Sequence, residues 1–539
     1  MTSNTAKVDA VIVGAGISGL YQLYKLRNLG LTTRVYEAGD DVGGTWYWNR
    51  YPGLRCDISS MLYSYSFSPE LEQEWNWTEK YATQPEILRY VNHVADRFDL
   101  RKDITFSTRV VSAVYDEVNK LWQVTTDTGE VVETQFLIMA TGVLSAPKTP
   151  DIAGIEKFRG STYHTAQWPR EDVDFAGKRL AVIGTGSSGV QSIPILAQRA
   201  ADMTVFQRTP CFTIPAGHRP LTEKEVADMK ANYQEFHELQ LKSALGVPME
   251  PPSKSALEVT EEERNAVFQE AYEEGTIFAI GSRYQDILSD KAANEMAAEF
   301  LRQKIQSVVR DPEVAESLSP RTFPYGTKRI CLDTKYYETF NLPHVHLVDL
   351  RKTPLVEITE TGVRTSEKEY EVDAIVFATG FDAITGALTR IDIQGKGGVS
   401  LKHKWAEQGP RSYISMAISG FPNLFVVTGP LGPGVFSVMT MAIEHDVNWI
   451  TDCIRYLREQ SIAEIEAMAE AEDEWAEFVV SAANKTLFPL ANSWYMGANV
   501  PNKPRGFMAY VGGFAEYKQK CDEVAQKGYE GFAMLSPIL

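Results

Sequence analysis

Residues 8–19 read VDAVIVGAGISG, and this stretch decides the fold of the first part of the chain. An apolar run typical of a β-strand ends in Gly14-x-Gly16-x-x-Gly19, and a helix-like stretch and a second apolar strand, TTRVYEA, follow it. Gly14 allows a tight turn, Gly16 lets the backbone approach a pyrophosphate, and Gly19 lets the helix pack closely on the strand. The free N–H groups at the start of such a helix bind phosphate. The sequence therefore predicts a Rossmann-type dinucleotide-binding unit.

The same pattern returns at residues 179–189, RLAVIGTGSSG, and the strand MTVFQRTP follows it. The second strand ends at Glu37 in the first copy, but at Gln207, followed by Arg208, in the second copy. A carboxylate accepts hydrogen bonds from a ribose 2′-OH and repels a 2′-phosphate, whereas a guanidinium binds that phosphate. The first unit is therefore predicted to bind FAD or NAD, and the second to bind NADP.

One cofactor site thus favours a ribose 2′-hydroxyl and the other favours a 2′-phosphate. This combination indicates that NADPH passes a hydride to a bound flavin. Two further apolar runs, FLIMATG (136–142) and AIVFATGFD (374–382), each stop at a Thr-Gly pair. Such turns are typical of places where the chain crosses between two nucleotide-binding domains, although either run alone is also consistent with any buried strand. We therefore predict an α/β protein with two Rossmann-like domains.

Composition and charge narrow the class of protein. The 539 residues carry 53 basic and 71 acidic side chains, a formal net charge of −18, which argues against nucleic acid as a partner. The five cysteines are far apart and form no CxxC, so neither a zinc site nor any other metal site is expected, and a reducing cytosol is favoured. The uncharged, apolar stretch 424–443 is interrupted by prolines and glycines and makes a poor membrane span. We expect a cytoplasmic protein without a membrane span.

A segment between the two units narrows the chemistry. Residues 158–169, FRGSTYHTAQWP, resemble the FxGxxxHxxxWP fingerprint of type I Baeyer–Villiger monooxygenases. Residues 43–57, GGTWYWNRYPGLRCD, are similar to that family's GGxWxxxxYPGxxxD pattern at every fixed position. Segments 74–91 and 493–505 resemble the phenylacetone and steroid monooxygenase branch, in a family that also includes cyclohexanone monooxygenases. The resemblance extends from Val8 to near Phe532.

This resemblance implies a reaction. Such enzymes reduce FAD with NADPH, form a C4a-peroxyflavin with O₂, and convert a ketone to an ester or lactone. Arg329, in FPYGTKRICLD (323–333), matches the family's catalytic arginine, which is expected to stabilise the peroxyflavin and the carbonyl adduct, and Asp57 matches its acidic partner. A salt bridge that serves only the fold is the alternative for Arg329. For His164 we expect positioning of the interdomain segment, not catalysis.

The resemblance also implies the residues that contact the cofactors. Lys328 matches a residue at the 2′-phosphate, beside Arg208 and Thr209, and Trp494 resembles a mobile-loop tryptophan that closes over the nicotinamide cofactor. The other residues expected at the FAD and NADPH sites are Gly14, Gly16, Ser18, Gly19, Glu37, Gly44, Thr45, Trp46, Asp57, Tyr63, Gly184, Thr185, Gly186, Ser187, Ser188 and Gly189.

The remaining sequence predicts domain limits and a substrate pocket. An FAD domain is expected over 1–144 and 381–539, an NADP domain over 145–216 and 327–380, and a helical insertion over 217–326, where Thr222 and Thr260 open capping boxes. Val435, Phe436 and Met439 are expected either to line the ketone pocket or to be core residues near the flavin. The expected partners are a small-molecule ketone and O₂, with the chain as a monomer or small homo-oligomer. A flavin monooxygenase acting mainly on sulfides or amines, and a dinucleotide-binding redox sensor, are the alternatives.

Overall fold

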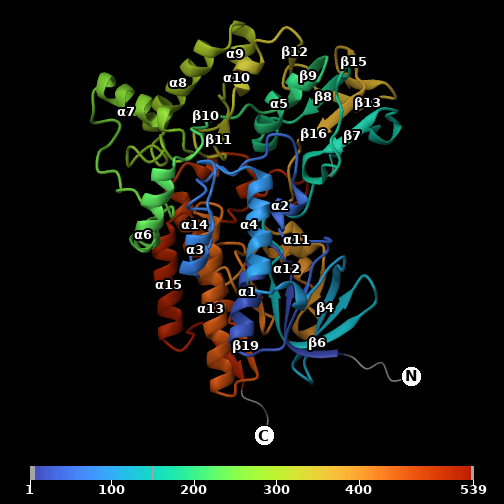
Figure 1. The fold of residues 1–539 in the computed structure, drawn as a ribbon, viewed down its shortest axis with the longest axis vertical. Coiled ribbons are helices and arrows are strands. Elements are labelled where there is room, and N and C mark those ends of the chain that lie inside the picture. Colours follow the sequence, from blue (N-terminus) through green and yellow to red (C-terminus); the bar gives the residue numbers. More distant parts are fainter. Residues whose placement is uncertain (1–5, 149, 536–539) are drawn as a thin grey trace.

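The computed structural model describes residues 6–148 and 150–535, and it contains two lobes, one built on a mixed sheet and the other on a parallel sheet (Figure 1). The lower lobe holds both ends of the described chain and most of the long helices. The upper lobe contains the middle of the sequence, from β7 through β16, except α6, which lies against the lower lobe. This arrangement agrees with the predicted α/β class and its two Rossmann-like units.

The sheet of the lower lobe forms around the first glycine motif. Its strands run in the order β17-β4-β5-β6-β1-β2-β3, and β18 pairs with β6. The neighbours β6, β1, β2 and β3 are parallel, as a Rossmann unit requires, while β4 and β5 form an antiparallel hairpin. The strands are β1 (Ala6–Val13), β2 (Thr33–Tyr36), β3 (Ile104–Thr105), β4 (Val110–Asp116), β5 (Leu121–Thr126), β6 (Val131–Met139), β17 (Asp392–Gln394) and β18 (Leu424–Val426).

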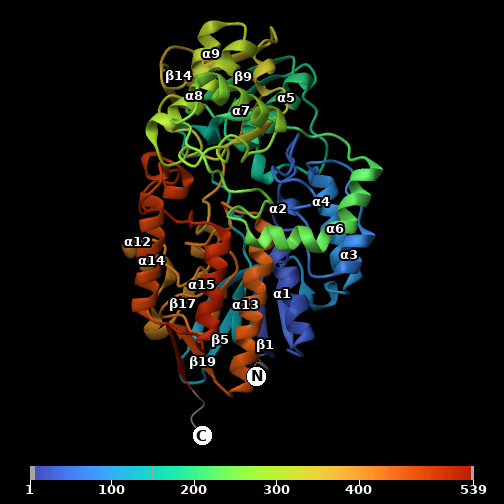
Figure 2. The ribbon, with the colours of Figure 1, turned by 90° about the vertical axis from the view of Figure 1, so that its left-hand side faces the viewer.

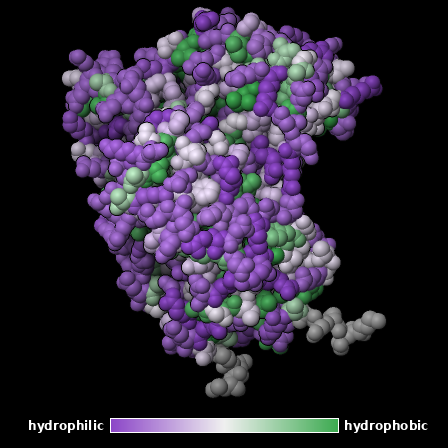
Figure 3. Space-filling view, in the orientation of Figure 1, coloured by the Kyte–Doolittle hydropathy of each residue, from purple (hydrophilic) through white to green (hydrophobic). Residues whose placement is uncertain are grey.

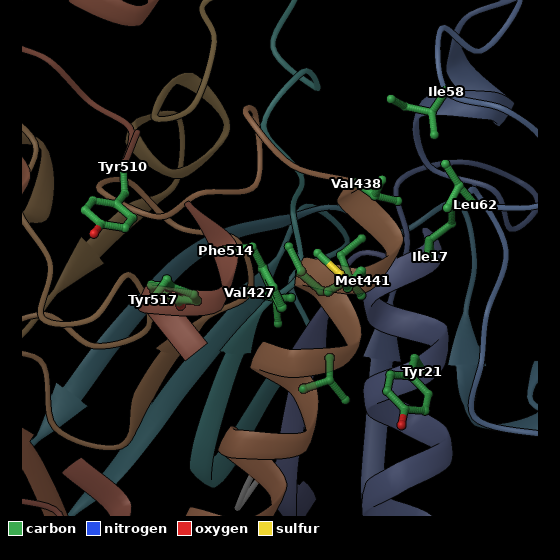
Figure 4. Packing of buried hydrophobic residues seen from close by; sticks show 14 of the residues in the cluster. Ile17, Tyr21, Ile58, Leu62, Val427, Val438, Met441, Tyr510, Phe514 and Tyr517 are labelled. Carbon is green, nitrogen blue, oxygen red and sulfur yellow. The ribbon is translucent and has the colours of Figure 1, made fainter. Parts of the chain in front are cut away.

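Long helices cover this sheet and bury its apolar side chains. Helix α1 packs against α13, whose buried face includes Val447, Ile450 and Leu457. Figure 4 shows Met441 of α13 on the side that faces α1. The helices of this lobe are α1 (Ile17–Asn28), α2 (Thr45–Trp48), α3 (Pro69–Glu74), α4 (Gln84–Arg97), α11 (Gly386–Thr389), α12 (Leu401–Gln408), α13 (Met439–Glu459), α14 (Ala469–Asn484) and α15 (Phe514–Gln526).

The sheet of the upper lobe repeats the pattern around the second glycine motif. Its five parallel strands run in the order β12-β9-β8-β16-β7, and α5 connects β8 to β9. The elements are β7 (Ser161–His164), β8 (Arg179–Ile183), α5 (Ser187–Arg199), β9 (Asp202–Gln207), β12 (Val345–Asp349) and β16 (Ala374–Phe377). Smaller elements complete both lobes: β10 (Thr213–Pro215), β11 (Cys331–Asp333), α10 (Tyr336–Thr339), β13 (Leu355–Ile358), β14 (Gly362–Thr365), β15 (Glu369–Glu371), β19 (Glu464–Ala467) and β20 (Phe532–Leu535).

Both glycine turns are held against the Ala-Thr-Gly segments that the sequence singled out. Gly14 has φ +105°, and a Cβ there would lie 2.6 Å from the carbonyl oxygen of Ala140. Gly184 has φ +110°, and a Cβ there would lie 2.4 Å from the carbonyl oxygen of Ala378. A left-handed backbone and a contact this close both require glycine. The two nucleotide-binding units therefore share the same turn construction.

The segment predicted as a helical insertion is helical among its described residues, and it reaches the lower lobe. Helix α6 contacts α3 and α15, and Figure 2 shows it lying across the long helices of the lower lobe. Its capping box at Thr222 is complete, with Glu225 as the partner. At Thr260 the side chain accepts the Glu263 N–H, but the predicted capping box is not completed, because the Glu263 carboxylate accepts from Lys254 at 2.8 Å instead. The helices are α6 (Glu223–Lys242), α7 (Glu261–Glu274), α8 (Lys291–Val308) and α9 (Pro312–Leu318).

The visible face of the molecule is largely hydrophilic, with small separate apolar patches (Figure 3). Across residues 6–148 and 150–535, no helix combines the length and the apolar character that a bilayer crossing requires.

Candidate functional site

The structure brings Arg329 and Asp57 together from distant parts of the sequence. The Nε of Arg329 donates to one Asp57 carboxylate oxygen at 2.7 Å and Nη2 donates to the other at 2.9 Å, which is a bidentate ion pair. Burial opposes the charge of Arg329, but Asp57 more than offsets this effect, so the pKa of the guanidinium lies above its ordinary value. Arg329 is thus a permanently charged group held in one orientation, and about a quarter of each side chain stays exposed.

One of the three predicted substrate-pocket residues, Val435, contacts this ion pair directly. The third donor of Arg329, Nη1, reaches the carbonyl oxygen of Val435 at 3.0 Å. Phe436 packs its ring against Phe488 at 4.9 Å between centroids and against Tyr495 at 4.6 Å. Phe436 and Met439 are partly buried members of the same apolar cluster as Val435. The guanidinium therefore has an apolar, aromatic wall beside it.

Tyr495 is a residue of this site that the sequence did not single out. It is buried and packs on Trp494 with ring centroids 4.2 Å apart. Burial raises the pKa of its hydroxyl to about 12, although the nearby Arg329 charge lowers it. The only signal in the sequence is its place beside Trp494, because the contact with Arg329 joins segments far apart in the chain. Trp494 itself is partly buried against the apolar cluster.

The first glycine motif and Glu37 form a cradle suited to a dinucleotide. The buried carboxylate of Glu37 accepts the Ala15 N–H at 2.8 Å and the Gly39 N–H at 2.7 Å. Each carboxylate oxygen has a second lone pair, so the group can still accept ribose hydroxyls. Ser18 and Gly19 are buried in the first turn of α1. The acid predicted from spacing thus lies beside the glycine turn.

A second turn approaches the first one closely. A Cβ on Gly44 would lie 2.8 Å from the Cα of Gly16, so the two backbones almost touch. Gly44 precedes Thr45, the first residue of α2, and Trp46 of that helix donates its indole N–H to the Tyr63 hydroxyl at 3.2 Å. This brings the predicted FAD-site residues of segment 43–63 against the pyrophosphate turn.

The second glycine motif leaves open space in front of it. A Cβ on Gly189 would lie 2.4 Å from the carbonyl oxygen of Gly184, so Gly189 is required for packing. A Cβ on Gly186 would have no atom of the chain within 4 Å. Gly186 precedes Ser187 and Ser188, which start α5. The turn therefore has room for a phosphate group on its open side.

Positive side chains gather beside this turn. Burial lowers the pKa of Lys328 and of Lys148, and repulsion from the Arg208 charge lowers both further, although Cys211 opposes the shift of Lys328. An anion bound near Arg208 would relieve this repulsion. Thr209 is tied to the turn because its carbonyl oxygen accepts the Thr185 hydroxyl at 3.0 Å. Arg208, Thr209 and Lys328 are the residues expected at the 2′-phosphate, and Lys148 is a further cation that the sequence did not single out.

Two contacts connect the lobes near these sites. The His164 Nε2 lies 3.1 Å from the Lys148 carbonyl oxygen and 3.1 Å from the Thr379 hydroxyl, so it contacts both segments that cross between the lobes. Burial lowers the pKa of His164, which favours the neutral ring. Tyr51 donates its hydroxyl to Gln191 of α5 at 2.9 Å. Both side chains are placed to position the lobes.

Comparisons with known proteins agree with this geometry. The family model for pyridine nucleotide-disulphide oxidoreductases matches residues 11–281. A solved structure of an oxidized steroid monooxygenase bound to NADP is 51% identical with a TM-score of 0.93, covering 98% of this chain and 100% of that one.

Two relatives align with this chain over nearly its full length. Cyclohexanone 1,2-monooxygenase of an Acinetobacter species is 42% identical, covering 97% of this chain and 96% of the relative. Phenazine N-monooxygenase of Lysobacter antibioticus is also 42% identical, covering 98% of this chain and 97% of the relative. Fold, glycine turns, fingerprint segments and full-length identity together show that the chain belongs to the Baeyer–Villiger monooxygenase family of flavoproteins.

Proposed function

We propose that this protein oxidises ketones to esters or lactones with NADPH and O₂, and that Arg329 and Asp57 form its catalytic pair. The observation that carries the proposal is the bidentate Arg329–Asp57 pair beside an apolar, aromatic wall. A ketone is mainly apolar with one polar carbonyl, so it needs an apolar pocket with one fixed cation. Similar proteins with ketone-oxidising names support the reaction class.

FAD and NADPH are the cofactors. FAD would be held by the turn at Gly14 and Gly16 and by Glu37, which would bind its ribose. Residues 44–46 and Tyr63 would contact the rest of the cofactor. When bound, the flavin supplies the redox chemistry that activates O₂. NADPH would be held by the turn at Gly184, Thr185 and Gly186, with the 2′-phosphate among Arg208, Thr209, Lys328 and Lys148. The open space at Gly186 and the clustered cations fit such a ligand.

The residues of the chain have distinct tasks in this proposal. Arg329 presents a fixed positive charge where negative charge develops on the substrate oxygen, so it stabilises the transition state. Asp57 holds the guanidinium plane through two hydrogen bonds. Tyr495, Phe436 and their apolar neighbours exclude water, which strengthens the interaction between Arg329 and the developing charge.

The Arg329 assignment is tested by its variants. We expect Arg329→Ala to retain ketone-independent NADPH oxidation and to lose ester formation by a factor on the order of 10² to 10³. Arg329→Lys keeps a charge but cannot make the bidentate pair, so its loss should be intermediate. Ester yield by gas chromatography and NADPH loss by absorbance separate the two steps. Ester formation at the wild-type rate in Arg329→Ala would exclude the catalytic role.

For the substrate pocket we propose that Val435, Phe436 and Met439 face the ketone. Phe436→Ala would remove a ring that packs against Phe488 and Tyr495 and would enlarge the pocket. We expect kcat/KM to shift by about tenfold or more in favour of bulky over small ketones. An unchanged ratio of kcat/KM values across both classes would instead make Phe436 a core residue.

Oxidation of nitrogen or sulfur is the second candidate, because one full-length relative bears the name of an N-monooxygenase. Parallel assays with a ketone, a sulfide and an amine, followed across pH, distinguish the two candidates. Ester formation as the major reaction supports the proposal, and N- or S-oxide formation without ester contradicts it. We also propose a cytoplasmic location, supported by five cysteines that are all free thiols.

A further inference from the structure

Two cysteines that are far apart in sequence meet beside the second glycine turn. Cys211 donates its thiol to the Thr185 carbonyl oxygen at 2.9 Å, and the Cys331 sulfur lies 3.4 Å from the Ser187 hydroxyl. Their segments are joined directly, because Thr213 of β10 pairs with Cys331 of β11 and the Cys331 N–H donates to the Phe212 carbonyl oxygen at 3.2 Å. Both thiols therefore touch the turn between β8 and α5.

The two thiols also interact with each other, and their surroundings make them unequal. A hydrogen bond from Cys331 lowers the pKa of the Cys211 thiol, burial opposes this effect, and the Lys328 charge assists it. The same contact and burial raise the pKa of Cys331. Cys211 is partly exposed and Cys331 is buried. Cys211 is therefore the more acidic and the more accessible of the two thiols, and Cys331 lies beside it as a protonated neighbour that could resolve an oxidised Cys211.

We propose that Cys211 and Cys331 form a redox pair that closes into a reversible disulfide when hydrogen peroxide oxidises Cys211. In the first step the Cys211 thiolate attacks one peroxide oxygen, the O–O bond breaks, and Cys211 becomes a sulfenic acid while hydroxide leaves as water after protonation. In the second step the Cys331 sulfur attacks the Cys211 sulfur, and the sulfenic hydroxyl leaves as a second water with the Cys331 proton. Two thiols and one peroxide give one disulfide and two waters.

The disulfide would act on cofactor binding through the turn. Forming the bond removes the Cys211 hydrogen bond to Thr185 and draws Cys331 away from Ser187, and both of these residues belong to the turn. The bond would also join the segment after Arg208 to the segment after Lys328. We expect the oxidised protein to bind NADP⁺ on the order of tenfold more weakly, the size of one lost hydrogen bond.

Peptide mapping tests the bond itself. The purified holoenzyme is treated with hydrogen peroxide, its free thiols are alkylated under denaturing conditions, and the digest is analysed by mass spectrometry. We expect a linked peptide containing Cys211 and Cys331, lighter by two hydrogens than its two parts and separated again by dithiothreitol. Two alkylated thiols at these positions after peroxide treatment, or a link to a different cysteine, would overturn the proposal.

Variants and a binding measurement complete the test. In Cys331→Ser we expect Cys211 to be trapped by dimedone as a sulfenic acid, and in Cys453→Ser, which alters a buried cysteine elsewhere, we expect the wild-type link. NADP⁺ titration by fluorescence before and after peroxide measures the affinity, and an unchanged affinity overturns the coupling to cofactor binding. The proposed function enters this inference at one point only, as the source of hydrogen peroxide in the cell. Because peroxide is added directly, absence of ester formation leaves this test intact.

Discussion

Gly16 and Gly186 occupy the same position in the two glycine motifs, but the chain constrains them differently. A Cβ on Gly16 would lie 3.2 Å from the Cα of Gly44, whereas a Cβ on Gly186 would meet no atom of the chain within 4 Å. Gly186 has φ −79°, which alanine adopts without strain. The fold itself therefore does not require glycine at position 186. In the proposed NADP site, the bound cofactor imposes that requirement.

This difference predicts the behaviour of Gly186→Ala. The added methyl group would occupy the space proposed for the pyrophosphate, and overpacking costs about 1–3 kcal/mol. We expect the NADP⁺ dissociation constant to rise at least about tenfold while the thermal midpoint stays close to that of the wild type. Gly189→Ala is the matched control, because its Cβ would lie 2.4 Å from the Gly184 carbonyl oxygen and should destabilise the fold. Unchanged NADP⁺ affinity in Gly186→Ala would place the cofactor elsewhere.

At the scale of single residues, the sequence predicted features that depend on neighbours close in the chain. Glycine spacing and the acid at Glu37 depend on neighbours in one βαβ unit, so pattern and periodicity were sufficient. The contact of Tyr495 with Arg329, the place of Lys148 among the cations, and the meeting of Cys211 with Cys331 each join distant segments. No spacing rule encodes such contacts, because they depend on how the two lobes pack.

At the scale of elements, α6 is joined to the lower lobe by a titratable pair. His237 of α6 makes an ion pair with the buried Glu72 of α3. His237 also lines a cavity together with Glu444 of α13. Burial opposes the His237 charge, but Glu72 outweighs it, so the pKa of His237 lies above its ordinary value. Burial raises the pKa of Glu444 to about 7, although the Ser66 hydrogen bonds oppose this.

Both shifts predict the same dependence of stability on pH. A group whose pKa is higher in the folded state stabilises that state at pH values below its unfolded-state pKa, which is about 6.5 for histidine and 4.3 for glutamate. This contribution is lost as the pH rises through the folded-state pKa. We therefore expect His237→Ala to lower the unfolding free energy at pH 6 by on the order of 2 kcal/mol, and by less at pH 9. Thermal midpoints at the two pH values measure the difference.

The control for this prediction is His346→Ala. His346 pairs with Asp202 at 3.1 Å, but both side chains are about half exposed, and such surface pairs contribute little. We expect its effect to be small at both pH values. An equal loss of stability at pH 6 and pH 9 in His237→Ala would show that the ring contributes packing and not charge.

At the scale of the whole molecule, the proposed catalytic pair depends on how the lobes meet. Asp57 belongs to segment 51–57 of the lower lobe, and α5 of the upper lobe packs on that segment. Gln191 of α5 accepts the Tyr51 hydroxyl at 2.9 Å and donates to the Arg55 carbonyl oxygen at 3.1 Å. A Cβ on Gly53 would lie 2.3 Å from the Gln191 carbonyl oxygen, so no layer of side chains separates the two backbones. Lobe packing and the position of Asp57 are thus directly connected.

Gln191→Leu should therefore disturb oxygenation more than flavin reduction. The substitution removes two hydrogen bonds between the lobes, each worth about 1 kcal/mol, without changing a residue of the proposed ion pair. We expect less ester per NADPH consumed and more hydrogen peroxide, because a looser Asp57 segment holds Arg329 less firmly and admits water. Gln198→Leu changes an exposed glutamine on the same helix and should keep the wild-type ratio. If both variants gave the wild-type ratio of ester to NADPH, the catalytic pair would be held without the help of α5.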